Sequence, residues 1–150
     1  MKQIRTVLLM LMAGTLALTS CKKDGGSKTS ASMNLSVDGS AKSTSSVIAT
    51  YYQSEKSLQV IATFSGGASV SFMIQNIKVG SFDASTDEVL ATYSTSNSFA
   101  DTYTGDSGTV TITSFANGTV KGTFAFAASK TGGSTTHITG GSFTSAYTTQ

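Results

Sequence analysis

The sequence contains no proline, no tryptophan, one cysteine and one histidine. A single cysteine cannot form a disulfide within the chain, and a single histidine cannot build a zinc site, which needs three or four clustered ligands. Charged residues make up only 12% of the chain. Such sparse charge leaves no basic surface of the kind that binds the phosphate backbone of nucleic acids. We therefore expect no metal centre and no nucleic-acid partner.

Serine and threonine, by contrast, make up about a third of the chain, well above their ordinary usage. Threonine favours β-strands, while serine suits turns and the exposed faces of sheets. The chain has 150 residues, a length that suits one domain with a core of its own. The composition therefore favours a single β-rich domain.

Residues 1–20 have the pattern of a secretory signal peptide. Lys2 and Arg5 supply positive charge, and an apolar run follows from Val7 to Leu18. A transmembrane helix needs about 20 consecutive apolar residues, so this run is too short to span a bilayer. We predict that residues 1–20 are a cleaved signal.

The segment Leu18-Thr19-Ser20-Cys21 resembles the lipobox of bacterial lipoproteins. The resemblance implies that the Cys21 thiol receives diacylglycerol, that the bond before it is cut, and that the new amino group is acylated with a fatty acid such as palmitate. Several acyl chains hold a protein on a membrane far better than one, because each buried methylene contributes about 0.8 kcal/mol. Cys21 is therefore the predicted lipid anchor. We expect a cell-envelope location at the outer membrane, facing either the periplasm or the exterior.

Residues 22–30 read Lys-Lys-Asp-Gly-Gly-Ser-Lys-Thr-Ser and contain no apolar side chain. This composition is typical of a flexible spacer, and the start Cys-Lys-Lys-Asp is similar to that of many Bacteroidetes lipoproteins. We predict a lipidated flexible tether over residues 21–30 and one all-β domain over residues 31–150.

Beyond Ser32, apolar and polar residues alternate with a period of two, which predicts half-buried β-strands. Strands are expected at residues 33–37, 47–52, 58–64, 70–74, 89–94, 98–104, 110–115, 120–126 and 138–147. About eight or nine short strands of this kind are typical of an antiparallel sandwich or a small barrel. Alternation alone does not distinguish these two architectures.

Three short motifs predict turns between these strands. Asp38-Gly39 and Asn117-Gly118 have the composition of two-residue hairpin turns, and Asn117-Gly118 suits a type I′ turn. Gly105-Asp106-Ser107-Gly108 is also predicted to form a turn. This last motif is similar to the nucleophile motif of chymotrypsin-like proteases. Those enzymes need a histidine and an aspartate upstream of the serine, whereas His137 lies downstream.

Three segments of the second half form hairpin patterns: Gly-Thr-Val-Thr-Ile-Thr-Ser at 108–114, Val-Lys-Gly-Thr-Phe-Ala-Phe at 120–126 and Ile-Thr-Gly-Gly-Ser-Phe at 138–143. With them, residues 31–147 resemble a family of Bacteroidetes lipoproteins of unknown function with a DUF6252-like β domain. The chain lacks the tryptophan expected early in the domain of many relatives. The resemblance implies an all-β fold and brings no catalytic residue.

Carboxylates gather at Asp83, Asp87 and Glu88, where they could offer oxygen ligands to calcium. The run lacks the glycine and the terminal spacing of an EF-hand loop, so we expect a solvated loop. Asp101 and Asp106 would join a calcium site only if the fold brought them near.

Aromatic side chains could provide a face on which sugars stack. The tyrosines are Tyr51, Tyr52, Tyr93, Tyr103 and Tyr147. Because Tyr51 and Tyr52 are adjacent on a predicted strand, they point to opposite faces, so packing in the core or at its rim is favoured. His137 follows two threonines on the last predicted strand and is expected to be exposed.

We expect no catalytic residues, no cofactor and no enzymatic activity. The predicted function is that of a lipid-anchored binding or structural module, which contacts the membrane through Cys21 and an envelope protein or glycan through its loops. The alternatives are a small-ligand carrier of barrel type and an envelope hydrolase, which would need a paired acid and base. An apolar pocket with convergent polar groups would favour the carrier, and a filled interior would favour action through the surface.

Overall fold

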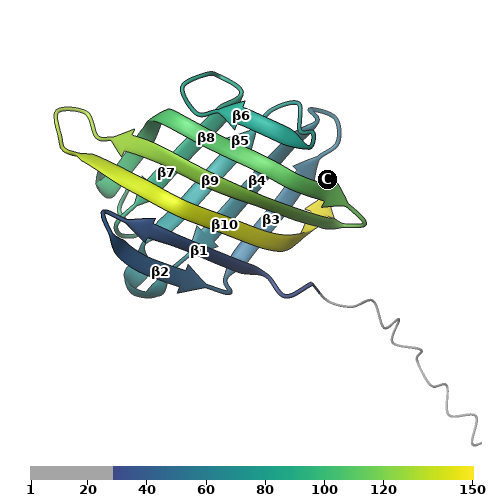
Figure 1. Ribbon diagram of the computed structural model, residues 1–150, viewed down its shortest axis with the longest axis horizontal. Coiled ribbons are helices and arrows are strands. Elements are labelled where there is room, and N and C mark those ends of the chain that lie inside the picture. Colours follow the sequence, from purple (N-terminus) through teal and green to yellow (C-terminus); the bar gives the residue numbers. More distant parts are fainter. Residues whose placement is uncertain (1–28) are drawn as a thin grey trace, which may run out of the picture.

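The computed structural model describes residues 29–150, which form ten β-strands and two single-turn 3-10 helices (Figure 1). The strands are β1 (Ser32–Val37), β2 (Ser40–Thr44), β3 (Val47–Tyr52), β4 (Ser57–Thr63), β5 (Ser69–Ile74), β6 (Gly80–Asp83), β7 (Val89–Ser94), β8 (Thr102–Ala116), β9 (Thr119–Ser129) and β10 (Thr135–Thr149). The 3-10 helices are η1 (Ser65–Gly67) and η2 (Phe99–Asp101). The all-β prediction is confirmed. In residues 29–150, no helix is long and apolar enough to cross a membrane.

Seven of the strands close into a barrel in the order β3-β4-β5-β7-β8-β9-β10. The closing pair is β10 and β3, which run parallel with Tyr147 opposite Ala49 and Thr149 opposite Tyr51. The other neighbouring pairs in the barrel are antiparallel. Of the two architectures that the alternation left open, the structure therefore has the barrel.

The remaining strands extend this barrel at its two longest strands. The early part of β10, from Ile138 to Thr144, pairs with β1, and β1 in turn pairs with β2. On the other side of the barrel, β8 pairs with β7 over Thr102–Thr104 and with β6 over Thr109–Ile112. Along one edge, each of these two long strands therefore pairs first with one strand and then with another. This is possible because β8 and β10 each have 15 residues.

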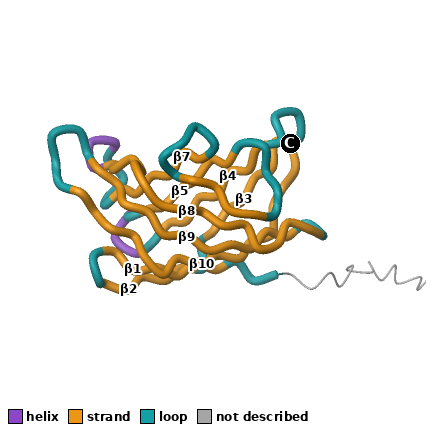
Figure 2. The backbone as a smooth tube through the Cα atoms, turned by 45° about the horizontal axis from the view of Figure 1, so that its top comes forward, coloured by secondary structure: helices purple, strands orange, loops and turns teal. Residues whose placement is uncertain are grey.

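The barrel interior is filled by side chains from two crossing layers. Figure 2 shows β3, β4, β5 and β7 on one side, and β8, β9 and β10 with β1 and β2 on the other. Between the layers, the Phe72 ring centroid lies 5.0 Å from that of Phe124 and 5.4 Å from that of Phe143. Aliphatic side chains that are almost completely buried surround these rings: Met33, Leu58, Val60, Val70, Ile74, Val110, Ile112, Val120 and Ile138.

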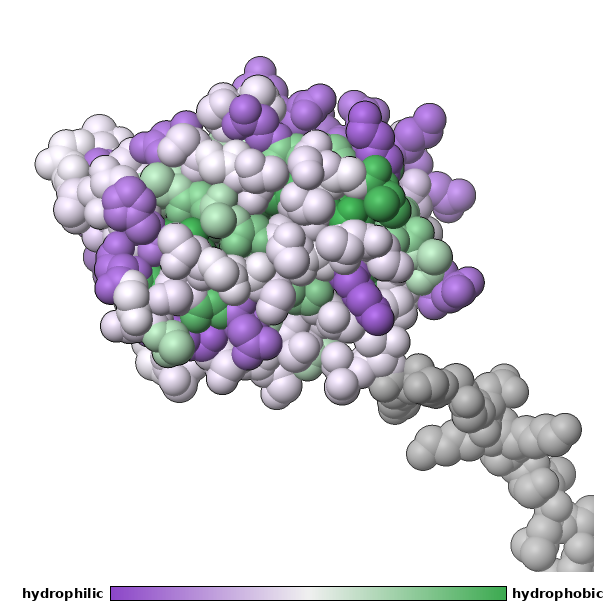
Figure 3. Space-filling view, viewed as in Figure 1, coloured by the Kyte–Doolittle hydropathy of each residue, from purple (hydrophilic) through white to green (hydrophobic). Residues whose placement is uncertain are grey.

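The outer surface reflects the serine and threonine content. The face of β8, β9 and β10 seen in Figure 3 is mostly near white, the colour of intermediate hydropathy, with small apolar patches between polar rims. Neighbouring hydroxyls also bond to one another, as Ser81 Oγ and Thr111 Oγ1 do at 2.9 Å. A threonine presents a β-branched methyl to its strand and a hydroxyl to solvent, which suits this exposed face.

The predicted turn at residues 105–108 is wrong, because β8 runs without interruption from Thr102 to Ala116. Gly105 and Ser107 pair with the consecutive residues Ala128 and Ala127, so Asp106 is an extra residue in a β-bulge. Gly108 has a φ of +125° and lies so close to the backbone of β9 that no side chain would fit there. Residues that are typical of a turn form a bulge here, because β9 continues to pair with β8 along this stretch.

The two predicted hairpin turns are confirmed. Asn117 and Gly118 have φ values of 51° and 71°, and Asp38 and Gly39 have values of 48° and 86°. Positive φ at both central residues is what a type I′ turn requires. The strand β2, which follows the Asp38-Gly39 turn, was not predicted, because in its sequence Ser-Ala-Lys-Ser-Thr apolar and polar residues do not alternate. The predicted strand at 98–104 begins only at Thr102.

Candidate functional site

The connection between β7 and β8 carries the most exposed large apolar side chain of the described domain. Phe99 is 95% exposed and lies in η2, within a connection of seven residues, 95–101, that we call the Phe99 loop. Aromatic residues are enriched in protein interfaces and Phe99 has no packing role within the barrel. The Phe99 loop is therefore the candidate functional site.

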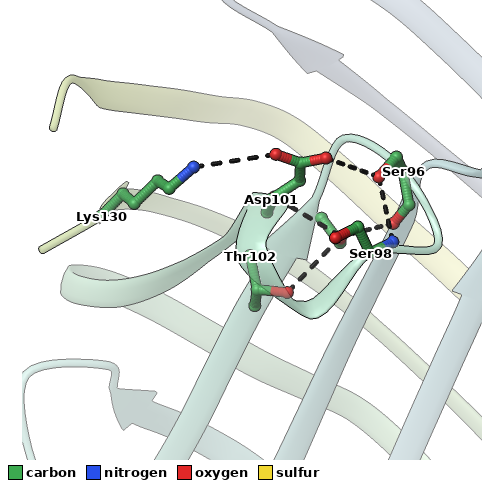
Figure 4. Close-up of polar contacts among 6 residues, drawn as sticks. Ser96, Ser98, Asp101, Thr102 and Lys130 are labelled. Carbon is green, nitrogen blue, oxygen red and sulfur yellow. Dashed lines mark hydrogen bonds and ion pairs between the residues drawn. The ribbon is translucent and has the colours of Figure 1, made fainter.

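Polar contacts hold the Phe99 loop in shape (Figure 4). Ser96 Oγ donates a hydrogen bond of 2.7 Å to Asp101 Oδ2 and accepts one of 3.0 Å from the Ser98 amide. The Asp101 amide donates to the Ser98 carbonyl oxygen at 3.0 Å, and Ser94 Oγ donates to the Ser96 carbonyl oxygen at 2.6 Å. The loop is thus fixed by its own side chains, which lowers the entropy lost when Phe99 meets a partner.

Asp101 also connects the Phe99 loop to the turn between β9 and β10. Its Oδ1 lies 3.7 Å from Nζ of Lys130, while its other oxygen accepts from Ser96 (Figure 4). Both side chains of the ion pair are about 40% exposed, so the pair contributes at most about 1 kcal/mol to folding. Its main effect is to hold two neighbouring loops together.

An open depression of about 660 Å³ lies beside Phe99. Its walls come from the Phe99 loop, the start of β8 and the end of β9, with side chains that include Phe99, Thr102, Thr104, Asp106, Ser129 and Lys130. Ser129 Oγ donates a hydrogen bond of 2.7 Å to Asp106 Oδ2 across the floor of the depression. One aromatic ring beside hydroxyls and two charges of opposite sign suits a surface contact with another macromolecule.

The acidic residues singled out from the sequence form separate local contacts. Asp83 Oδ1 accepts hydrogen bonds from the Ser85 hydroxyl at 2.7 Å and from the Ser85 amide at 2.8 Å. These two donors hold the pKa of the Asp83 carboxyl below its usual range. Asp101 belongs to the Phe99 loop and Asp106 lies on β8 beside it, and the two carboxylates bond to different partners. Among residues 29–150, no group of three potential metal ligands comes together.

His137 is exposed on β10, as predicted. Its amide donates a hydrogen bond of 2.8 Å to Asp38 Oδ1, and the Asp38 amide donates to the His137 carbonyl oxygen at 2.9 Å. Both contacts use the backbone of His137. They fix the β1–β2 turn onto β10.

The tyrosines do not form a single row. Tyr51 lies at one end of the barrel, where its ring meets Phe115 and Tyr147 edge to face, with centroids 5.2 and 6.0 Å away. Its neighbour Tyr52 donates a hydrogen bond of 3.4 Å to Gln59 Oε1. Tyr93 is buried beside Tyr103, and burial raises the pKa of its hydroxyl. The tyrosines therefore pack in the core or at its rim and do not form a common face on which a sugar could stack.

Sequence reasoning missed Phe99. The residue lies in the predicted strand 98–104 and is not among the candidate site residues predicted from the sequence. A signal was present in the polar run Ser94-Thr95-Ser96-Asn97-Ser98, because such a run before a lone phenylalanine is typical of a loop rather than a strand. Cys21 and the predicted signal peptide lie outside the residues that the structure describes.

A closed β-barrel with a filled interior and a fixed, exposed aromatic loop defines the chain as a small all-β domain. The chain belongs to the family described as a domain of unknown function (DUF6252), which it matches over residues 29–146. No curated protein and no solved structure matches the chain. The family resemblance inferred from the hairpin segments is thus confirmed.

Proposed function

We propose that the protein is a lipid-anchored module of the cell envelope that binds a partner through the Phe99 loop and catalyses no reaction. Cys21 would carry the acyl chains, and residues 22–30 would link them to the barrel. The partner class that the loop fits best is another envelope protein, because aromatic side chains such as Phe99 are enriched in protein interfaces and charged ones such as Asp106 and Lys130 suit the polar rim.

The position of the Phe99 loop relative to the start of the domain carries this proposal. The hydroxyls of Thr29 and Thr119 lie 3.1 Å apart, so the described part of the chain begins beside the first residue of β9. The depression next to Phe99 lies at the other end of β9, at Ser129 and Lys130. Ten residues of strand separate Thr119 from Ser129, a rise of about 33 Å. A chain held at Cys21 would therefore present the Phe99 loop away from the membrane.

The filled interior supports action through the surface rather than carriage of a small ligand. A closed barrel is compatible with a carrier, but Phe72, Phe124 and Phe143 occupy the space between the layers. The rival hydrolase needs a free acid and base. Asp101 and Asp106 are instead bonded to Ser96, Lys130 and Ser129. Both alternatives are thus less well supported than a binding module.

Metabolic labelling tests the anchor. In cells given an alkyne-bearing fatty acid, the wild-type protein should incorporate the label and remain in the membrane fraction. Cys21→Ala should lose both. A mutant labelled as well as the wild type would contradict the proposed anchor.

Site-specific photocrosslinking tests the contact. A p-benzoylphenylalanine placed at Phe99 keeps an aromatic side chain there and should form a discrete adduct, in intact cells, with one protease-sensitive partner. The same probe at Ile48, another exposed apolar position, is the matched control and should form none. Adducts of equal yield at both positions, or none at position 99, would refute a specific contact through the Phe99 loop. An adduct that resists protease and yields to glycosidases would identify a glycan instead.

A further inference from the structure

The end of the barrel at which the described chain begins is assembled from five segments that lie far apart in sequence. Thr29 lies beside Thr119 at the β8–β9 hairpin, and the Tyr147 amide donates to the Gly118 carbonyl oxygen at 2.9 Å. The Gln53 amide donates to the Gln150 carbonyl oxygen at 2.9 Å, which joins the β3–β4 turn to the end of β10. The segment after β5 is attached by the Ile77 amide, which donates to the Lys56 carbonyl oxygen at 2.8 Å.

This end carries apolar and aromatic surface. Phe115 and Tyr147 stack with their centroids 4.7 Å apart, and both rings are only partly buried. Val79, which follows the Ile77 segment, is 61% exposed. Tyrosine rings with one apolar side and one polar tip are enriched where proteins meet the membrane–water interface. The composition of this end therefore suits an interface between water and lipid.

Lysines lie around the same end. Lys56 lies in the β3–β4 turn and Lys78 precedes Val79, while Lys121 pairs across the sheet with Ser114 near the hairpin. All three are exposed, and within residues 29–150 the ion pair present involves Lys130 instead. We call Lys56, Lys78, Val79, Phe115, Lys121 and Tyr147 the basal face.

The neighbouring acids do not cancel this charge. Glu55 is next to Lys56, and the Glu88 carbonyl oxygen accepts a hydrogen bond of 2.9 Å from the Gln75 amide at the margin of the basal face. The sequence before the domain adds three lysines at positions 22, 23 and 28 against Asp24. With Asp87 beside Glu88, the basal face and the adjoining sequence together hold six lysines and four acids.

We propose that the basal face rests on an anionic membrane surface and so orients the barrel, an inference that depends on the lipid anchor proposed at Cys21. Seven residues lie between Cys21 and Thr29, so the eight steps along the chain reach at most about 28 Å when fully extended. The anchor would therefore keep this end of the barrel near the headgroups. At such short range, weak contacts suffice, because a short tether gives an effective concentration of the order of millimolar.

Each lysine near an anionic surface contributes about 1 kcal/mol of attraction. The three lysines of the basal face would therefore shift the tethered domain toward the membrane-bound orientation by about a hundredfold, if their contributions add. Salt should weaken the attraction, because ions screen exposed charges. The orientation that results is the one in which the Phe99 loop points away from the bilayer.

A fluorescent probe can test this contact on the lipidated mature protein. Cys21 is the only cysteine and would be acylated, so Val79→Cys introduces a unique thiol for an environment-sensitive dye. The protein is placed in nanodiscs of phosphatidylcholine alone or of phosphatidylcholine and phosphatidylglycerol in equal parts. We expect the dye at position 79 to shift to the blue and to be protected from aqueous iodide only in the mixed discs. A dye on Ile48→Cys is the control and should stay quenched in both.

Neutralising the lysines completes the test. The combined variant Lys56→Gln, Lys78→Gln and Lys121→Gln should abolish the protection of the dye at position 79, and raised salt should do the same to the unsubstituted basal face. Equal quenching in both kinds of disc, or full protection in the triple variant, would overturn the proposal. If the anchor itself were wrong, the protein would not co-purify with the discs. If the anchor were right but the basal face did not touch the membrane, the protein would stay on the discs and the dye would remain accessible to iodide.

Discussion

The rings of Phe72 on β5 and Phe124 on β9 lie with their centroids 5.0 Å apart, in contact across the interior of the barrel. The two strands belong to opposite layers and are not hydrogen-bonded neighbours. Phe124 also lies 6.3 Å from Phe143, which makes it a common member of the aromatic contacts in the core. A domain without disulfides or described metal ligands depends on such contacts for its stability.

Phe124→Ala should lower the free energy of unfolding by about 3–5 kcal/mol, because it removes a ring that is only 4% exposed and leaves a cavity. Urea denaturation followed by circular dichroism measures the change. Thr123→Ala changes the adjacent, exposed residue and should cost far less. A midpoint of Phe124→Ala equal to that of the wild type would mean that the ring does not pack in the core.

Gly108→Ala should lower the free energy of unfolding by more than the addition of one methyl group usually does. The added methyl would meet the backbone of Ala125 and Phe126 at a φ of +125°, so we expect a loss of about 3 kcal/mol or more from overpacking and strain together. Gly118→Ala is the control, because Gly118 has a φ of 71° but open space around it. That change should cost only about 1–2 kcal/mol. Equal losses, measured by thermal unfolding, would contradict the close approach at Gly108.

Asp101→Ala should loosen the Phe99 loop while leaving the barrel intact. The change removes the acceptor of Ser96 Oγ and the partner of Lys130, so the Ser98 amide, which donates to Ser96 Oγ, should exchange faster with deuterium. The global free energy of unfolding should fall by no more than about 1 kcal/mol. Asp106→Ala removes a different contact and should leave the exchange of Ser98 unchanged. Unaltered exchange in Asp101→Ala would show that Asp101 does not support the loop.

The Asp83 carboxyl should titrate at a pH below its usual range, because Ser85 donates two hydrogen bonds that favour the charged form and lower the pKa. Since this pKa is lower in the folded state, the stabilisation is present above the ordinary aspartate range and is lost as the pH falls through the lowered value. Ser85→Ala should raise the pKa of Asp83, and Ser81→Ala should not. Carbon chemical shifts of the carboxyl, followed against pH, measure both. No change in Ser85→Ala would show that its hydroxyl is not the main cause.

Much of the strand pattern could be read from the sequence because burial alternates along each strand. β3 and β7 begin and end at the predicted residues, since their apolar positions are bounded by polar turns. β2 was not predicted because it lies at the edge of the sheet and has no buried side chain. Backbone pairing with β1, rather than burial, holds it in place. The Gly105–Gly108 run was misread because a bulge and a turn use the same residue types.

The candidate site could be predicted less well than the fold. Asp101 and Asp106 were predicted as candidate carboxylates, but their partners Lys130, in the β9–β10 turn, and Ser129, at the end of β9, lie more than 20 residues away in sequence. Phe99 lies in a segment predicted to be a strand, whereas the chain forms a 3-10 turn there. Whether an aromatic side chain is buried or presented to solvent depends on what packs over it, and a single segment of sequence does not contain that information.

The sequence alone predicts most of the β-strands, the two hairpin turns and the family, because these depend on local alternation, on glycine with aspartate or asparagine at positive φ, and on matched segments. The closure of the sheet, the bulge at Asp106 and the placement of the Phe99 loop and the basal face at opposite ends depend instead on the tertiary structure. Closure depends on the parallel pairing of Tyr147 with Ala49, two residues almost 100 positions apart. Contacts at such separations follow from how whole strands pack, and local patterns do not specify them.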